Sequence, residues 1–210
     1  MRRFALLCIL LALPVLAPRQ AAAHPHVWVT MRSALVFADG KLTAVRQAWT
    51  FDDAFTAFAL QGLDRKADGS YGDDVLKPLA EVNVSSLKEY GYFSTGKTAT
   101  AKFGFKDPVD YYLTFKDDLL TLHFTLPLAK PMPAKGLLTV EVNDPTVFIS
   151  FSFAETDPLK VEGAPANCAP EVISPQAPQA GALSESFFNS LTATSTYGAQ
   201  FAEKAVVKCP

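Results

Sequence analysis

The amino-acid sequence predicts one α+β domain, made mainly of antiparallel β-sheet hairpins with two or three helices packed against them. Two observations carry this prediction. Short segments rich in Tyr, Phe and Val alternate with turn residues along most of the chain, which is typical of β hairpins. Only a few segments place apolar residues at the 3.6-residue spacing of a helix. The chain is long enough for one domain with a sizeable core.

The N-terminal segment 1–23 has the pattern of a secretion signal that is removed after export. Two arginines precede the apolar stretch 4–16, and Ala21-x-Ala23 is a small-residue cleavage site. The apolar stretch is shorter than the roughly 20 residues that a membrane-spanning helix needs. We therefore expect cleavage after about Ala23, no membrane span in the mature domain 24–210, and a periplasmic location.

The predicted mature chain is acidic. The secretion signal holds three of the 19 basic residues and none of the 21 acidic ones, so 16 basic and 21 acidic residues remain. Nucleic acids and anionic membranes bind proteins through clustered positive charge, so neither is expected as a partner.

The cysteine pattern predicts a disulfide. Cys8 leaves with the secretion signal, and Cys168 and Cys209 remain. In an oxidising compartment these two are expected to pair, with a Cys/His metal site as the alternative. The bond would close a loop of about 40 residues and stabilise the fold by about 4 kcal/mol in the chain-entropy model.

The first expected elements are two strands, 27–37 and 42–51, joined at the Asp39-Gly40 turn. Two helices are expected next. Asp52 or Asp53 can cap the first of them, which ends before Gly62. The second helix starts at the acidic pair Asp73 and Asp74 and ends near Tyr90, and its regular part is expected from about Lys77 because of Pro78. Its predicted apolar stripe is Leu79, Val82, Leu87 and Tyr90.

The rest of the chain reads as three further hairpins, followed by a connector and a short terminal region. The hairpin turns are expected at Thr95-Gly96-Lys97, Lys116-Asp117-Asp118 and Asn143-Asp144-Pro145. A Pro-rich connector at about 163–181 follows. A last helix is expected after Ser184, stapled by Leu183 and Phe188, and a short strand 205–208 ends the domain.

The sequence contains no hydrolase, P-loop, dinucleotide or H-E-x-x-H motif. It has three histidines and no expected free thiol in the mature chain, so few groups are available for nucleophilic attack or proton transfer. We therefore expect no catalytic residues and interpret the protein as a non-enzyme, in which any chemistry is centred on a metal ion.

The predicted cleavage site places two histidines at the mature N-terminus. His24 and His26 would occupy positions one and three, beside a new free amine. Pro25 has no amide hydrogen, which excludes a four-nitrogen site that uses its backbone amide. A chelate remains, in which the His24 amine and imidazole bind the metal together with the His26 imidazole. Imidazole donors suit Ni, Zn and Cu, and the sequence does not select among them.

In an extended chain His24 and His26 face the same way, so they can converge on one ion. A further ligand could come from an imidazole or a carboxylate: His123, Asp52, Asp53 or Asp144. Each also has a structural interpretation. His123 lies on the polar face of a predicted strand, Asp52 and Asp53 can be helix caps, and Asp144 can be a turn residue.

Several segments of the mature chain carry a family resemblance: HPHVWVT, AVRQAWTFDDAF, SSLKEYGYF, LTLHFTLPL and VNDPTVFISF. In this order they resemble the bacterial exported family labelled as the periplasmic component of an uncharacterised ABC-type transport system, also called a domain of unknown function. Genes of that family are often found beside nickel/cobalt exporter-type proteins. The resemblance implies a role in metal handling in the periplasm.

Together these observations favour an exported accessory protein that binds a divalent transition metal near its mature N-terminus and assists a membrane metal transporter or exporter. Two alternatives remain open. One is a metal-free interaction module that docks on a membrane transporter. The other is a copper-dependent oxidative enzyme with an N-terminal histidine brace.

Overall fold

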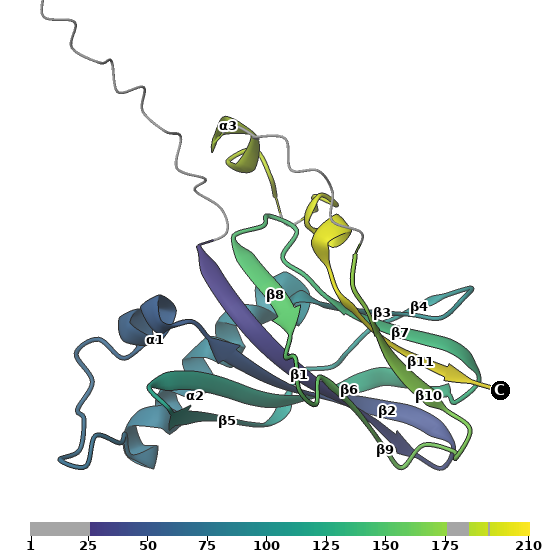
Figure 1. Ribbon diagram of the computed structural model, residues 1–210, viewed down its shortest axis with the longest axis horizontal. Coiled ribbons are helices and arrows are strands. Elements are labelled where there is room, and N and C mark those ends of the chain that lie inside the picture. Colours follow the sequence, from purple (N-terminus) through teal and green to yellow (C-terminus); the bar gives the residue numbers. More distant parts are fainter. Residues whose placement is uncertain (1–25, 176–184, 193) are drawn as a thin grey trace, which may run out of the picture.

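The predicted α+β class is confirmed by the computed structural model, which describes residues 26–175, 185–192 and 194–210. The expected secretion signal, His24 and Leu183 lie outside these residues. Two β-sheets and a few helices make up the domain (Figure 1).

The larger sheet, sheet A, has six strands, and its order is β5 (Val109–Lys116), β6 (Leu119–Pro133), β2 (Lys41–Phe51), β1 (Val27–Ala38) and β8 (Ile149–Phe153), with β9 (Leu159–Glu162) also paired to β1. Sheet B has five strands in the order β10 (Ala169–Ile173), β11 (Lys204–Cys209), β7 (Gly136–Val142), β3 (Ser94–Lys97) and β4 (Lys102–Phe103). The helices are α1 (Asp53–Ala59), α2 (Asp73–Leu87) and α3 (Glu185–Phe188), with 3-10 turns at Lys88–Phe93 and Gly198–Phe201.

Two predicted hairpins of sheet A are confirmed. Strands β1 and β2 pair antiparallel around the Asp39-Gly40 turn, and β5 and β6 pair antiparallel around Asp117-Asp118. Asp39, Asp117 and Asp118 all have positive φ, which tight turns require and which Asp tolerates better than most residues. The expected final strand is also present, as β11.

The predicted hairpin around Asn143-Asp144-Pro145 is wrong. Strand β7 lies in sheet B, whereas β8 lies in sheet A and pairs parallel to the N-terminal half of β1. The turn therefore carries the chain from one sheet to the other. Val147 has a φ of 61°, and the buried Asp144 carboxylate holds the turn by accepting hydrogen bonds from Thr146 and Ile149.

The turn predicted at Thr95-Gly96-Lys97 is also wrong, because these residues belong to β3. The turn lies at 98–101, where the Thr98 hydroxyl accepts from the backbone of Ala101. Gly96 serves another purpose here. A Cβ at this position would stand 2.0 Å from the Phe103 ring, so only glycine lets that ring pack against the neighbouring strand.

Helix α2 confirms the predicted acidic start, since it begins at Asp73. The later regular start expected near Lys77 is wrong, because the helix is already formed from Asp73 and contains Pro78. The predicted stripe is partly wrong. The buried residues are Leu76, Ala80 and Val84, spaced by four, whereas Val82 is 62% exposed. The expected Pro-rich connector is interrupted by strand β10, where Pro170 is tolerated because β10 is an edge strand.

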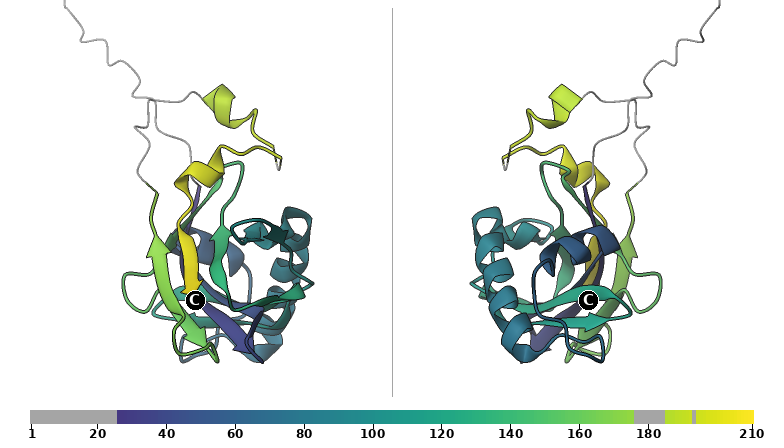
Figure 2. Two further views of the ribbon diagram at one scale, coloured as in Figure 1. Left: turned by 90° about the vertical axis from the view of Figure 1, so that its right-hand side faces the viewer. Right: turned by 90° about the vertical axis from the view of Figure 1, so that its left-hand side faces the viewer.

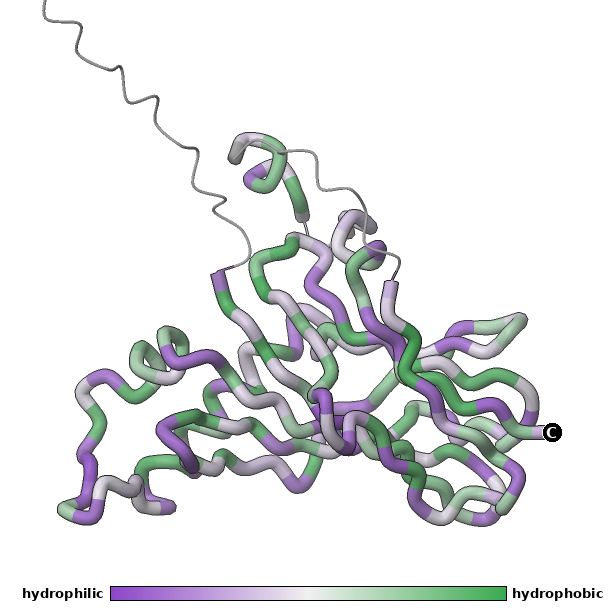
Figure 3. Tube along the Cα trace, viewed as in Figure 1, coloured by the Kyte–Doolittle hydropathy of each residue, from purple (hydrophilic) through white to green (hydrophobic). Residues whose placement is uncertain are grey.

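The inner face of sheet A is covered along its whole length. At the β5 and β6 end it packs against α2, through residues such as Trp49, Phe124 and Leu76. At the other end, Leu35 and Val45 pack against the apolar residues of sheet B. Figure 2 shows α2 on one side of the molecule and β10 and β11 on the opposite side. Figure 3 shows hydrophilic and hydrophobic residues alternating along the strands. The polar side chains of sheet A therefore gather on its outer face.

Candidate metal site and the outer face of sheet A

The N-terminal end of β1 lies between the end of β2 and the start of β8. His26, the first described residue, is exposed there. Its backbone N–H donates to the Phe148 carbonyl at 2.8 Å, and its ring centroid lies 4.8 Å from that of Phe148. His24 lies outside the described residues, so the chelate expected between His24 and His26 stays a prediction.

Asp52 is held at the same end of the sheet. Its Oδ2 accepts from the Trp28 backbone N–H at 2.6 Å, and its Oδ1 accepts from the Phe55 N–H at 2.8 Å, which caps α1. The predicted capping role is thus confirmed for Asp52. Each carboxylate oxygen retains acceptor capacity beyond one hydrogen bond, so capping leaves Asp52 able to bind a cation. Trp28 is two residues from His26 along β1, which places the Asp52 carboxylate and His26 at one end of sheet A.

The other carboxylates are differently placed. Asp53 is exposed in the first turn of α1 and accepts from the Ala54 N–H at 2.8 Å. Asp144 is only 5% exposed and accepts from the backbone of Thr146 and Ile149 and from the Thr146 hydroxyl. Its predicted role as a turn residue is confirmed, and these three donors occupy most of its acceptor positions.

His123 lies on the outer face of β6, as the alternation of that strand predicts. Its ring stacks on Tyr112 at 4.5 Å with an interplanar angle of 8°, and its Nε2 lies 3.0 Å from the Thr114 hydroxyl. Burial lowers the pKa of His123 below its ordinary value. The register aligns His123 with Ala48 and, through it, with Arg32. Arg32 is six residues from His26 along β1, about 20 Å of strand. The structure therefore does not bring His123 and His26 together.

Within the described residues, no group of three or more His, Cys, Asp or Glu side chains forms a metal-binding cluster. Cys168 and Cys209 form the predicted disulfide, with their Cα atoms 4.2 Å apart. It ties the residue before β10 to the last residue of β11.

The outer face of sheet A also contains a hollow with several charged residues in its lining, which could not be recognised from the sequence. It has a volume of about 200 Å³, and its lining includes Arg32, Ala34, Arg46, Ala48, His123, Lys160 and the two acids Asp157 and Glu162. The three basic residues of the hollow lie 14, 114 and 128 positions apart in the chain, so the sequence alone shows no relation between them. Only the pairing of β1 with both β2 and β9 places them around one point.

Among the described residues, no helix has the length and apolar character that crossing a membrane would require. The chain is 21% identical over 193 residues to an uncharacterised protein from Haemophilus influenzae, a match that covers 89% of this chain and 91% of that protein. The model of one family matches residues 9–209, which is nearly the whole chain. The chain therefore belongs to the family described as a protein of unknown function (DUF1007).

Proposed function

We propose that this protein is an exported accessory protein for transition-metal handling, which binds a divalent ion (Ni, Zn or Cu) near its mature N-terminus and assists a membrane metal transporter or exporter. The ion is the cargo of the protein. One observation carries the proposal: the exposed His26 lies at the end of β1, two residues after His24, with the Asp52 carboxylate at the same end of the sheet.

The residues at the N-terminal end of β1 would offer a metal ion both nitrogen and oxygen ligands. Cleavage after Ala23 would free the His24 amine, which can chelate together with the imidazole of the same residue. The His26 imidazole supplies a third nitrogen, and Asp52 offers a carboxylate oxygen. Nitrogen donors bind a metal only when they are deprotonated, so binding releases protons and weakens as the pH falls.

Export is part of the same proposal, because the free amine exists only after the secretion signal is removed. The Cys168–Cys209 disulfide is compatible with an oxidising compartment such as the periplasm. The resemblance to exported proteins whose genes lie beside nickel/cobalt exporters supports a membrane transporter as the partner.

The experiment begins with protein secreted from a bacterial host, whose intact mass fixes its first residue. Metal-stripped protein is then titrated with Ni²⁺, Zn²⁺ and Cu²⁺ by calorimetry. We expect a mature chain that starts at His24 and one saturable site for at least one of the ions. A chain that starts after His26, or the absence of saturable binding of any of the three ions, would contradict the proposal.

Single substitutions then locate the site. His24→Ala and His26→Ala are each expected to weaken binding by tenfold or more, which corresponds to about 1.4 kcal/mol or more. His123→Ala is the matched control, because it removes the third histidine of the chain at about 20 Å of strand from His26. Equal affinity of the His24→Ala and His26→Ala variants and the parent would remove the N-terminal site.

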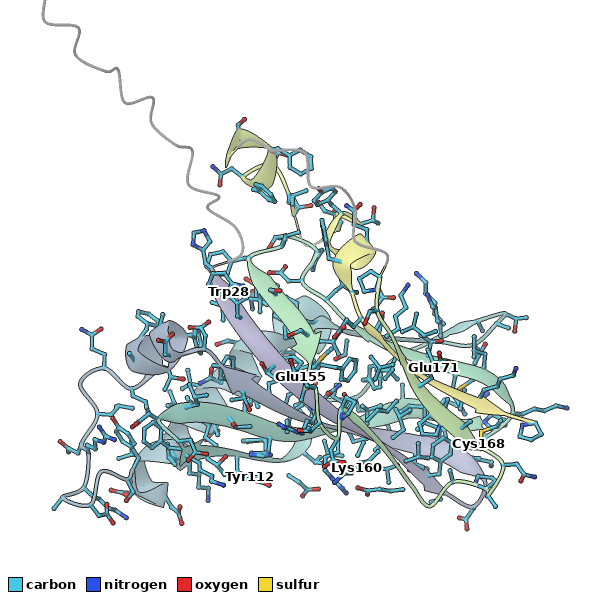
Figure 4. All side chains as sticks on the ribbon, in the orientation of Figure 1. Trp28, Tyr112, Glu155, Lys160, Cys168 and Glu171 are labelled. Carbon is cyan, nitrogen blue, oxygen red and sulfur yellow. A yellow bond between two sulfur atoms is a disulfide. The ribbon has the colours of Figure 1, made fainter. Side chains whose placement is uncertain are left out.

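A metal-free docking module is the second candidate, and the exposure of Trp28 favours it. This side chain is 54% exposed at the N-terminal end of β1 (Figure 4). Large aromatic side chains of this kind are enriched at protein interfaces. Under this alternative, metal-stripped protein and its His26→Ala variant would bind the transporter as well as the metal-loaded parent, whereas Trp28→Ala would not.

A further inference from the structure

The hollow on the outer face of sheet A arises from the strand register. Arg32 of β1 stands opposite Ala48 of β2, and Ala34 stands opposite Arg46. Each long basic side chain is thus paired with a methyl group. The two alanines are diagonal neighbours and form a low floor between taller side chains.

Two further strands complete the walls. His123 of β6 flanks Ala48 on the side away from Arg32, and Lys160 of β9 flanks Ala34 on the side away from Arg46. In each row an alanine therefore separates two large polar residues, which lie about 10 Å apart across two strand spacings. Ala34 is only 9% exposed although it lies on the outer face, because its taller neighbours rise around it.

The charges of the hollow leave basic groups unpaired. Arg46 reaches across β1 to Glu162, and its Nη1 donates to the two carboxylate oxygens at 2.8 and 2.9 Å. Within the described residues, the side chains of Arg32 and Lys160 have no ion-pair or hydrogen-bond partner. Asp157 is the other acidic residue of the lining. The five charges sum to plus one, and the hydrogen-bond donors exceed the acceptors available to them.

The size of the hollow limits its ligand. The hollow is open to solvent, and its volume of about 200 Å³ has room for a small organic or inorganic ion. Arg32 and Lys160 flank the alanine floor from different strands. Guanidinium groups bind carboxylate and phosphate oxygens in a bidentate manner, and ammonium groups bind them as point charges.

We propose that this hollow binds a small dianion, carboxylate or phosphate, between Arg32, Arg46 and Lys160. The site is separate from the N-terminal metal site. Figure 4 shows Trp28 at one end of sheet A, with Lys160 and Tyr112 well away from it. A defect in one site therefore leaves the other intact.

The test is a titration of metal-stripped, full mature protein with succinate and, separately, with inorganic phosphate, at constant ionic strength and monitored by NMR. Saturable shifts of the Ala34, Ala48 and Lys160 amides are expected for at least one anion. The anion that binds identifies the ligand as a carboxylate or a phosphate. The absence of saturable shifts with either anion would overturn the proposal.

Variants locate the anion. Arg32→Gln is expected to weaken binding about tenfold, the loss that follows from removing one charge-assisted contact. Because Arg32 is exposed and unpaired, this change leaves the fold intact. Ala48→Leu fills the floor without altering charge and is expected to weaken binding to a similar degree. Lys116→Gln is the control, since Lys116 lies on the same face two residues beyond Thr114 and outside the hollow.

A Lys116→Gln variant that weakens binding as much as Arg32→Gln would show general attraction by surface charge and would also overturn the proposal. The His26→Ala variant is expected to bind the anion like the parent. Failure of the metal site therefore cannot be mistaken for failure of the anion site.

Discussion

Asp52 connects the start of α1 to the N-terminal strand, and its replacement by alanine tests that connection. The change removes the side-chain cap on Phe55 and the acceptor of the Trp28 N–H. Loss of an N-cap costs about 1 kcal/mol. Loss of the second bond adds about 1 kcal/mol, which is less than the roughly 1.5–3 kcal/mol of hydrogen bonds to charged groups, because water can reach this exposed N–H.

We therefore expect Asp52→Ala to lower the free energy of unfolding by about 2 kcal/mol. For a domain of this size that corresponds to a fall in Tm of about 4–8 °C. Urea unfolding of metal-stripped protein, followed by tryptophan fluorescence, measures the free energy, and circular dichroism measures Tm.

Asp53→Ala is the matched control, because the Asp53 carboxylate accepts only from the adjacent Ala54 N–H. Its cost is expected to stay within about 0.5 kcal/mol, as for most surface substitutions. A loss at Asp53 equal to that at Asp52 would refute the reasoning. Asp52→Asn separates structure from binding, since asparagine caps helices as well as aspartate does but carries no charge. It is expected to keep most of the stability and to weaken metal binding if Asp52 is a ligand.

Three further changes probe the fold. Replacing Cys168 and Cys209 by serine together should cost about 4 kcal/mol in urea unfolding under oxidising conditions, and an unchanged midpoint would contradict the assigned disulfide. Gly96→Ala should cost about 1–3 kcal/mol because its Cβ would overlap the Phe103 ring, and Phe103→Leu should reduce the cost of adding that methyl group. The pKa of His123 is lowered in the folded state by burial, so folding favours the neutral ring. Stability should therefore fall as the pH drops below about 6.5, the unfolded value, and His123→Gln should remove this part of the pH dependence measured by urea unfolding.

Local sequence patterns correctly predicted the turns and helix starts that are determined by residues close together in the chain. The Asp39-Gly40 turn joins two strands of period two, and its neighbouring residues are enough to define the hairpin. The cap at Asp52 and the acidic start of α2 at Asp73 also depend only on residues within one helical turn. These features were predictable because no distant contact competes with them.

The wrong predictions share a non-local cause. Glycine at position 96 is typical of a turn, yet it lies in β3 because the ring of Phe103 occupies the space of a side chain. The residues Asn143-Asp144-Pro145 resemble a hairpin turn, yet the strands on either side of them do not pair. Strand β7 lies in sheet B, whereas β8 pairs parallel to β1 in sheet A.

The two candidate sites differ in the same way. The histidine pair is visible in the sequence, because His24 and His26 are close in the chain and follow a cleavage site. The basic hollow is not visible, because it exists only when Ala34 is aligned with Arg46 on one side and Lys160 on the other. A one-residue slip of β2 would turn Arg46 toward the core and Val45 toward water. The apolar inner face of β2, with Val45 and Trp49 fully packed, forbids that slip and so fixes the hollow.

The packing of sheet A also explains why neither candidate site lies on its inner face. The inner face is filled by α2 at one end and by sheet B at the other, and its residues are committed to the two apolar clusters. Substitutions there would cost core packing, whereas outer-face residues can change with little effect on stability. Ligand chemistry can therefore vary on the outer face of β1 while the same strand, through Val29, Met31 and Leu35, continues to hold the core together.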